Sequence, residues 1–167
     1  IAAEVCESFG AGSTEREIAN FVAERYAEAG GDGLTMLVVG SGPRSAAVNA
    51  PPTGRVLERG DVLRLDIIGT KARYHSDVAR TAVVGEPTAE QRRVHDLLLG
   101  VHRRCLEALR PGALTSDVYR IYREAMDEAL ATLKEDGTME ALYEKYFGTT
   151  PPESVAAGST NELLTND

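Results

Sequence analysis

The chain has 167 residues, a length typical of one domain, and its 43% hydrophobic and 26% charged residues suit a globular protein with a core. The net charge of −8 argues against nucleic acid or an anionic membrane as a partner, and no apolar run approaches the ~20 residues that cross a bilayer. Cys6 and Cys105 stand far apart without a pairing motif, which favours a reduced, cytoplasmic protein. The sequence starts at Ile1 rather than Met, so we expect a fragment or a processed product.

The apolar pattern and the turn signals predict an ordered series of elements. A capping box formed by Thr14 and Glu17 opens the first helix, and Gly30-Gly31 ends it. Three short segments then have the length and pattern of strands, and a close turn joins the last two. Antiparallel pairing of that hairpin indicates the α+β class rather than a doubly wound sheet. After the first helix, the expected elements are strands 34–39, 62–68 and 73–84, a loop over 41–54, and helices 88–109, 115–134 and 139–147.

Two aspartates, Asp66 and Asp77, lie within the two arms of this predicted hairpin. If the turn is Lys71-Ala72, they face each other directly, with Cβ atoms roughly 4.5–5.5 Å apart. Like charges at that distance are destabilising, so either one carboxylate holds a proton or a cation lies between them. Carboxylate oxygens suit Mg, Mn and similar ions, so the pattern suggests a divalent metal.

A plainer interpretation remains open from periodicity alone. Side chains alternate across a strand, so Leu63, Leu65 and Ile67 would face the core while the aspartates lie on the opposite face. The aspartates would then be ordinary exposed strand charges. Their charge would be balanced by Arg64, Arg73 and Arg80.

A family resemblance rests on residues 60–95, GDVLRLDIIGTKARYHSDVARTAVVGEPTAEQRRVH. This stretch resembles the metallopeptidases of the pita-bread fold, which include methionine aminopeptidases, aminopeptidase P, prolidases and creatinases. The segments 15–19, 39–42 and 109–112 also resemble family segments, and the resemblance covers about residues 1–122. The matching motif positions are Gly60-Asp61, Asp66, Tyr74, Ser76-Asp77, Arg80-Thr81, Val84-Gly85 and Pro87.

The resemblance implies a fold and an activity. The fold would be half of a pita-bread domain, an antiparallel sheet with helices packed on one face. The activity would be metal-dependent release of N-terminal residues from peptide substrates, closest to the Xaa-Pro branch. Asp66 and Asp77 would be metal ligands in a site for two divalent ions (Mn, Co or Zn), which polarise the scissile carbonyl and activate water. Asn49 would contact substrate at the position where the family usually has histidine.

Some family features have no counterpart in this sequence. Asn49 can form hydrogen bonds but cannot titrate near neutrality as a histidine would. The family's further ligands, one histidine and two glutamates from the second half of its fold, are not found. We therefore expect the chain to be inactive alone. The alternative is a non-catalytic remnant domain that acts through protein association or weak cation binding. The face that normally meets the second half would be exposed, so a homo-oligomer is a further expectation.

The sequence changes character after about Tyr122. Residues 128–148, EALATLKEDGTMEALYEKYFG, resemble the C-terminal end of amino-acid-type solute-binding proteins of ABC transporters. A generic helical tail with an apolar stripe is the other reading of this stretch. We therefore expect a partial peptidase domain over 1–122, a helical tail over 123–148 and disorder over 149–167, where the chain is polar and aperiodic.

Overall fold

The computed structural model describes residues 1–151, and the chain divides into two compact units, Ile1–Thr88 and Ala89–Asp167. Most of the segment for which disorder is expected, residues 152–167, lies outside the described residues. The first unit holds helices α1 (Ala2–Ser8) and α2 (Glu15–Glu28), strands β1 (Gly33–Ser41), β2 (Val62–Lys71) and β3 (Tyr74–Val83), and the 3-10 helix η1 (Gly42–Ala46). The second unit holds α3 (Ala89–Ala108), α4 (Thr115–Glu135) and α5 (Thr138–Phe147).

The capping box predicted at the start of α2 is confirmed. The backbone N–H of Thr14 donates to Oε2 of Glu17 over 2.7 Å, and the backbone N–H of Glu17 donates to Oγ1 of Thr14 over 3.2 Å. These two bonds satisfy backbone donors that the first helical turn leaves without partners. Local sequence therefore fixes where α2 begins.

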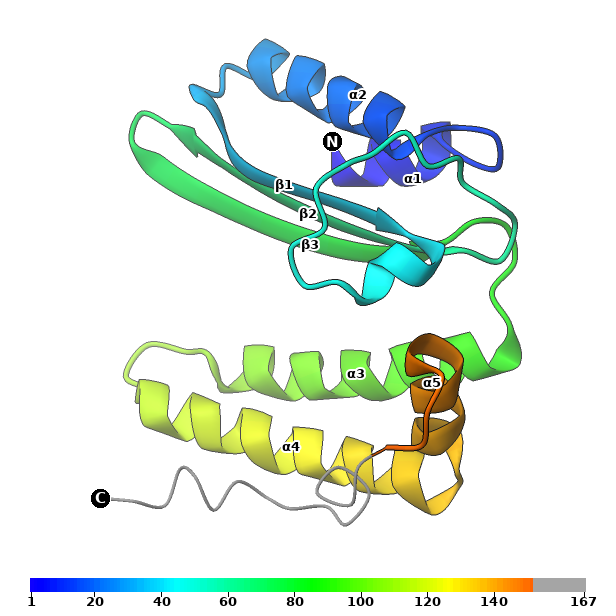
Figure 1. The fold of residues 1–167 in the computed structure, drawn as a ribbon. Coiled ribbons are helices and arrows are strands. Elements are labelled where there is room, and N and C mark those ends of the chain that lie inside the picture. Colours follow the sequence, from blue (N-terminus) through cyan, green and yellow to red (C-terminus); the bar gives the residue numbers. More distant parts are fainter. Residues whose placement is uncertain (152–167) are drawn as a thin grey trace. The chain divides into compact units, whose positions relative to one another are not determined.

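The sheet is antiparallel, with strand order β1-β2-β3. Figure 1 shows α1 and α2 covering one of its faces. Along β2 the residues alternate in burial, and Leu63, Leu65 and Ile67 point into the core beneath these helices, as predicted. Asp66 and its neighbours on alternate positions therefore lie on the other face, which we call the open face. The buried core of this unit consists of Val5, Ile18, Val22, Val39, Leu57, Leu63, Leu65, Ile67 and Val84.

The hairpin turn differs from the prediction. Lys71 pairs with Tyr74, so the turn residues are Ala72 and Arg73, and both have positive φ, 50° and 70°. Two consecutive left-handed residues are what a tight hairpin with the natural strand twist requires. Lys71 ends β2, and its Nζ donates to the carbonyl oxygen of Ala29 over 2.8 Å.

This turn changes the predicted pairing of the two aspartates. Asp66 pairs with Ala79, and Asp77 pairs with Ile68, so the prediction that they are directly opposite is wrong. The shift is by two residues on β3, which preserves the alternation of side chains. Asp66 and Asp77 consequently stay on the same face as diagonal neighbours, for which Cα atoms lie roughly 7–8 Å apart.

Gly69 on β2 lies directly under the ring of Tyr26 from α2. A Cβ at this position would overlap the Tyr26 ring and come within 2.9 Å of the carbonyl oxygen of Gly33. We expect Gly69→Ala to lower the free energy of unfolding by roughly 1–3 kcal/mol, because neither the ring nor the strand backbone can move freely. Urea unfolding followed by circular dichroism measures this loss.

Gly33 on the neighbouring strand provides the matched control for this substitution. A Cβ there would meet no atom within 4 Å. Gly33→Ala should therefore leave stability unchanged or slightly raised, since alanine also restricts the unfolded chain. Equal losses in the two variants would show that strand glycine itself, and not the Tyr26 contact, is what matters.

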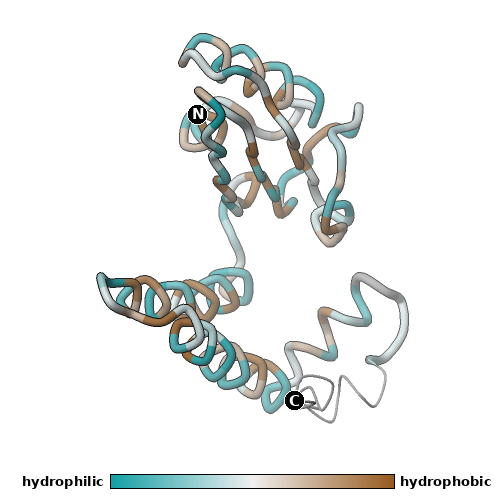
Figure 2. Tube along the Cα trace, turned by 90° about the vertical axis from the view of Figure 1, so that its left-hand side faces the viewer, coloured by the Kyte–Doolittle hydropathy of each residue, from teal (hydrophilic) through white to brown (hydrophobic). Residues whose placement is uncertain are grey.

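The second unit is built on the antiparallel packing of α3 and α4. Val101, Ala125 and Ala129 are buried between them, with Leu97 and Met126 packed against this cluster, and Figure 2 shows the hydrophobic positions along both helices. The helix α4 runs without a break through the proposed domain boundary at 122/123, and that boundary stays a prediction. In the part of the chain that the structure describes, no helix is long and apolar enough to cross a membrane.

Candidate metal and peptide site

Asp66 and Asp77 come together on the open face of the sheet. Asp66 is partly buried in the middle of β2, whereas Asp77 is exposed on the edge strand β3. On the other side of Asp66 its strand partner is Val38, which is 2% exposed. Asp66 therefore lies beside a buried valine side chain, whereas Asp77 reaches solvent.

The surroundings of Asp66 disfavour a free negative charge. Burial raises the pKa of its carboxyl group above the ordinary value, and the nearby Asp77 carboxylate raises it further, while the Arg64 guanidinium opposes them. Within the described residues, Oδ1 of Asp66 is buried and has no hydrogen-bond partner. A buried oxygen without a donor costs roughly 1–3 kcal/mol, which adds to the cost of ionising Asp66.

The arrangement of donors partly fits a divalent cation. A cation would neutralise the paired carboxylates and give Oδ1 of Asp66 the positive partner it lacks. Ions such as Mn²⁺ or Mg²⁺ take about six ligands, however. Among residues 1–151, no three His, Cys, Asp or Glu side chains are close enough to hold one ion. Asp66 and Asp77 thus fit one side of a metal site rather than a whole one.

The raised pKa of Asp66 leads to a testable expectation for the metal-free chain. We expect Asp66→Asn to raise the melting temperature by a few degrees at neutral pH. A folded-state pKa above the unfolded value means that the ionised group destabilises the fold above that pKa, and that this penalty disappears as the pH falls through it. Thermal unfolding at pH 7 and at pH 4 measures this: the gain should shrink at the lower pH. A variant less stable than the wild type at both values would contradict the assignment.

Asn49, the predicted substrate contact, lies in the loop that follows η1 and is exposed. Arg64, on the same face as Asp66, donates from its Nη1 to the carbonyl oxygen of Ala47 over 3.0 Å. The backbone N–H of Val39 donates to the carbonyl oxygen of Ala50 over 3.2 Å. The loop with Asn49 is therefore joined to β1 and β2 at the border of the open face.

A buried glutamate, Glu15, organises this loop, a role that the sequence pattern did not predict. Glu15 is 0% exposed. Its Oε1 accepts from the backbone N–H and Oγ of Ser41 over 2.9 and 2.8 Å, and its Oε2 accepts from the backbone N–H and Oγ1 of Thr53 over 2.9 and 2.6 Å. The Nε of Arg44 completes the set, 3.2 Å from Oε2. A signal existed, because Glu15 stands three and seven residues before the core residues Ile18 and Val22.

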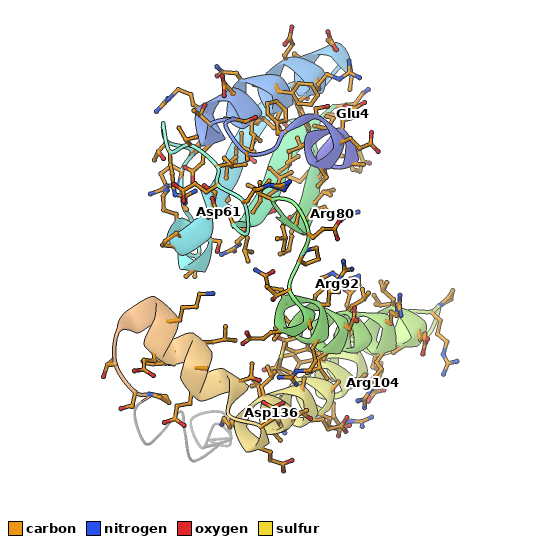
Figure 3. The ribbon with its side chains drawn as sticks, turned by 90° about the vertical axis from the view of Figure 1, so that its right-hand side faces the viewer. Glu4, Asp61, Arg80, Arg92, Arg104 and Asp136 are labelled. Atoms are coloured by element: carbon orange, nitrogen blue, oxygen red, sulfur yellow. The ribbon has the colours of Figure 1, made fainter. Side chains whose placement is uncertain are left out.

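A second ion pair adjoins this network. Arg55 donates to both carboxylate oxygens of Asp61, over 2.5 and 3.1 Å, and to Oγ of Ser41 over 2.7 Å, and Figure 3 shows Asp61 in the region of η1. Burial by itself would raise the pKa of Asp61, but the Arg55 guanidinium and the backbone N–H of Glu58 together outweigh it, and the pKa is lowered. Gly42 has a φ of 54°, and a Cβ there would come within 2.5 Å of Oδ1 of Asp61. The start of the loop that follows β1 is therefore also held in place, by the Arg55–Asp61 pair and its bond to Ser41.

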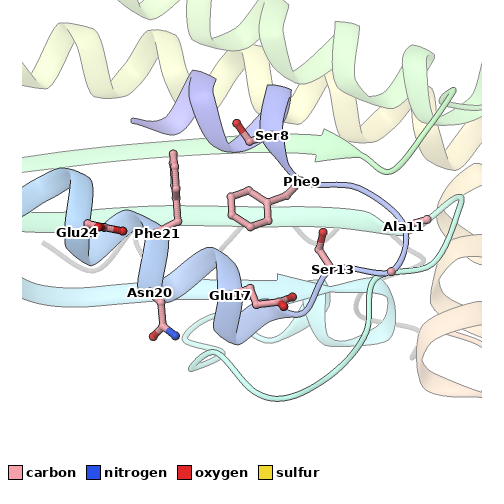
Figure 4. Close-up of a pocket in the computed structure, with 9 residues that line it drawn as sticks. Ser8, Phe9, Ala11, Ser13, Glu17, Asn20, Phe21 and Glu24 are labelled. Carbon is pink, nitrogen blue, oxygen red and sulfur yellow. The ribbon is translucent and has the colours of Figure 1, made fainter.

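A separate open hollow of about 510 Å³ lies along the turn between α1 and α2 (Figure 4). Its wall includes Ala11, Gly12 and Ser13 of the Gly10–Ser13 turn, whose sequence superficially resembles a phosphate loop. The turn is closed by its own bonds, since the backbone N–H of Ser13 donates to the carbonyl oxygen of Gly10 and that of Gly12 donates to Leu57. Glu17 and Glu24 also line the hollow, which disfavours an anion.

The first unit thus carries an antiparallel sheet with helices on one face and two neighbouring carboxylates, Asp66 and Asp77, on the other. The model of metallopeptidase family M24 matches residues 1–150, and the chain belongs to that family. Because this match continues through residues 128–148, the comparisons do not support the resemblance of that stretch to solute-binding proteins.

Known relatives agree with this family. A protein of Mycobacterium tuberculosis described as a probable dipeptidase PepE is 34% identical over 128 residues, which is 76% of this chain and 34% of that protein. The Xaa-Pro dipeptidase of Pyrococcus furiosus is 34% identical over 91 residues, 54% of this chain and 26% of that protein. The chain thus spans about a third or less of the length of these relatives.

Solved structures confirm the predicted α+β class and the pita-bread half-fold. The crystal structure of dipeptidase PepE from Mycobacterium ulcerans matches with a TM-score of 0.71 and 30% identity, over 77% of this chain and 35% of that one. The prolidase from Pyrococcus furiosus matches with a TM-score of 0.68 and 32% identity, over 73% and 36%.

Proposed function

We propose that Asp66 and Asp77 are two ligands of a divalent-metal centre in a peptidase that removes N-terminal residues from peptides of the Xaa-Pro type. The observation that carries this is the buried, unpartnered Oδ1 of Asp66 beside a second carboxylate on the open face. Membership of a metallopeptidase family and similarity to dipeptidases support it. When bound, such an ion supplies Lewis-acid and water-activating chemistry.

The proposal also assigns a role to Asn49 and an activity to the isolated chain. Asn49 lies in an exposed loop joined to the sheet next to Arg64, where its amide is free to donate and accept hydrogen bonds with a peptide backbone. Two carboxylates are a small part of a full coordination shell, so we propose that the chain by itself binds metal weakly and does not hydrolyse peptides. Assembly with a second chain stays a prediction.

Metal binding is tested by following the melting temperature of the full chain during a Mn²⁺ titration. A ligand that binds only the folded state raises stability by RT ln(1 + [L]/Kd). We expect a rise in the wild type that is lost in Asp77→Asn. Asp127→Asn is the matched control, since it removes the same charge from an exposed position on α4 and should keep the rise.

Two results would count against the proposal. A wild-type melting temperature that stays constant up to millimolar Mn²⁺ would favour the non-catalytic remnant domain. An equal rise of the melting temperature in the wild type and in Asp77→Asn would mean that Mn²⁺ binds at a site that does not include Asp77. Hydrolysis of the dipeptide Ala-Pro is measured in the same samples, and turnover above that of Asp77→Asn would overturn the expected inactivity.

A further inference from the structure

The carboxylate of Glu15 is bonded to both ends of one loop. On one side it accepts from Ser41, the last residue of β1, and on the other side from Thr53, near the end of the loop. Arg44 contacts this carboxylate from within the loop and donates from its Nη2 to the carbonyl oxygen of Pro51 over 2.6 Å. A side chain on α2 therefore closes the segment 41–53 into a defined shape.

The closed loop lies against the sheet next to Asp66. Gly40 is two residues from Val38 and shares its face, and a Cβ on Gly40 would be 2.9 Å from the carbonyl oxygen of Arg44 and 3.3 Å from Cβ of Ala50. The bonds from Val39 to Ala50 and from Arg64 to Ala47 attach the loop to both β1 and β2. Movement of the loop would change the wall of the open face beside Asp66.

We infer that Glu15 is a positioning residue for this wall: its carboxylate sets where the loop with Asn49 lies, and so shapes the surface that a peptide would meet beside Asp66. The inference rests on the proposed function only in taking the open face as the peptide-binding surface. Glu15 is not catalytic, because its oxygens are fully used by Ser41, Thr53 and Arg44 and it is 0% exposed.

The test is amide hydrogen exchange, followed by NMR, on the full ¹⁵N-labelled chain. The reporter is the backbone amide of Val39, which donates to Ala50 rather than to Glu15. The reference is the amide of Leu65 in the buried centre of β2, and the Asn49 side-chain amide signal reports on the loop itself. Glu15→Gln keeps the shape of the side chain but places N–H donors against those of Thr53 or Ser41. Glu17→Gln is the matched control, on the same helix and two residues away.

In Glu15→Gln we expect exchange at Val39 to accelerate at least tenfold more than exchange at Leu65, and the Asn49 signal to shift. In Glu17→Gln the ratio of the two rates should stay at the wild-type value. If Val39 and Leu65 accelerate together, or if Val39 is unaffected, Glu15 only adds stability and the inference is overturned. Thr53→Val, which removes one hydroxyl donor, decides the question if Glu15→Gln does not fold.

Mn²⁺ titration of the same samples separates the two proposals. If Mn²⁺ does not bind the wild-type chain, the proposed metal centre is overturned, and the exchange result still stands. An unchanged Val39-to-Leu65 ratio in Glu15→Gln would overturn the positioning role while leaving the metal centre intact.

Discussion

Glu15→Ala is expected to lower the free energy of unfolding by roughly 3–5 kcal/mol, because each buried hydrogen-bond donor that loses its acceptor costs about 1–3 kcal/mol. The substitution leaves the backbone N–H groups of Ser41 and Thr53 without their acceptor and removes the carboxylate that faces Arg44. Glu15 is 0% exposed, so water cannot easily replace these bonds. Urea unfolding at pH 7, followed by circular dichroism, gives the loss directly.

Glu17→Ala is the control for this variant, because it removes a carboxylate from the same helical turn. Glu17 caps α2 through Thr14 at an exposed site, so its loss should cost only about 0.3–1.5 kcal/mol. Equal losses in both variants would mean that helix capping, rather than the buried network, accounts for the role of Glu15.

The same network predicts a pH dependence. Burial by itself would raise the pKa of Glu15, but the hydrogen bonds from Thr53 and Ser41 outweigh burial, and the pKa lies below the ordinary value of 4.5. A group whose folded pKa is depressed stabilises the fold above its unfolded pKa, and this contribution is lost as the pH falls through the folded value. The stability difference between wild type and Glu15→Ala should therefore be constant near neutrality and shrink below pH 4.5. A difference that grows on acidification would contradict this.

Leu65→Ala is expected to cost roughly 2–5 kcal/mol, the range for removing a buried leucine side chain from a packed core. Leu65 is 1% exposed at the centre of β2 and packs in the cluster formed with Val39 and residues of α1 and α2. A cavity there cannot collapse easily, since strands lie on both sides. Urea unfolding measures the loss, and it should appear in the midpoint without a change in slope.

Val78→Ala provides the comparison for Leu65→Ala on the same face of the sheet. Val78 pairs with Ile67 on the edge strand but is 38% exposed. Its truncation should cost less than about 1 kcal/mol, because little apolar area is removed from contact. If Val78→Ala were as destabilising as Leu65→Ala, β3 would be covered by another part of the protein in solution.

Much of the secondary structure could be predicted from local sequence. Thr14 and Glu17 are three residues apart and form the capping box through hydrogen bonds to each other alone. The alternation along 63–67 predicted which residues of β2 are buried, because successive side chains of a strand point to opposite faces. The pairing of a close hairpin predicted an antiparallel sheet and the α+β class, which the solved relatives confirm.

The tertiary structure decided the features that depend on distant partners. The hairpin register differs from the predicted one by two residues because the turn lies at Ala72 and Arg73, two non-glycine residues with positive φ that no strand pattern indicates. The local sequence did not predict the role of Glu15, because a glutamate in a first helical turn is usually an exposed charge. Glu15 is buried and hydrogen-bonded only because the fold places Ser41, Arg44 and Thr53 around its carboxylate. Local sequence sets backbone geometry and the face of each side chain, whereas register and buried charge are set by partners that only the folded chain brings together.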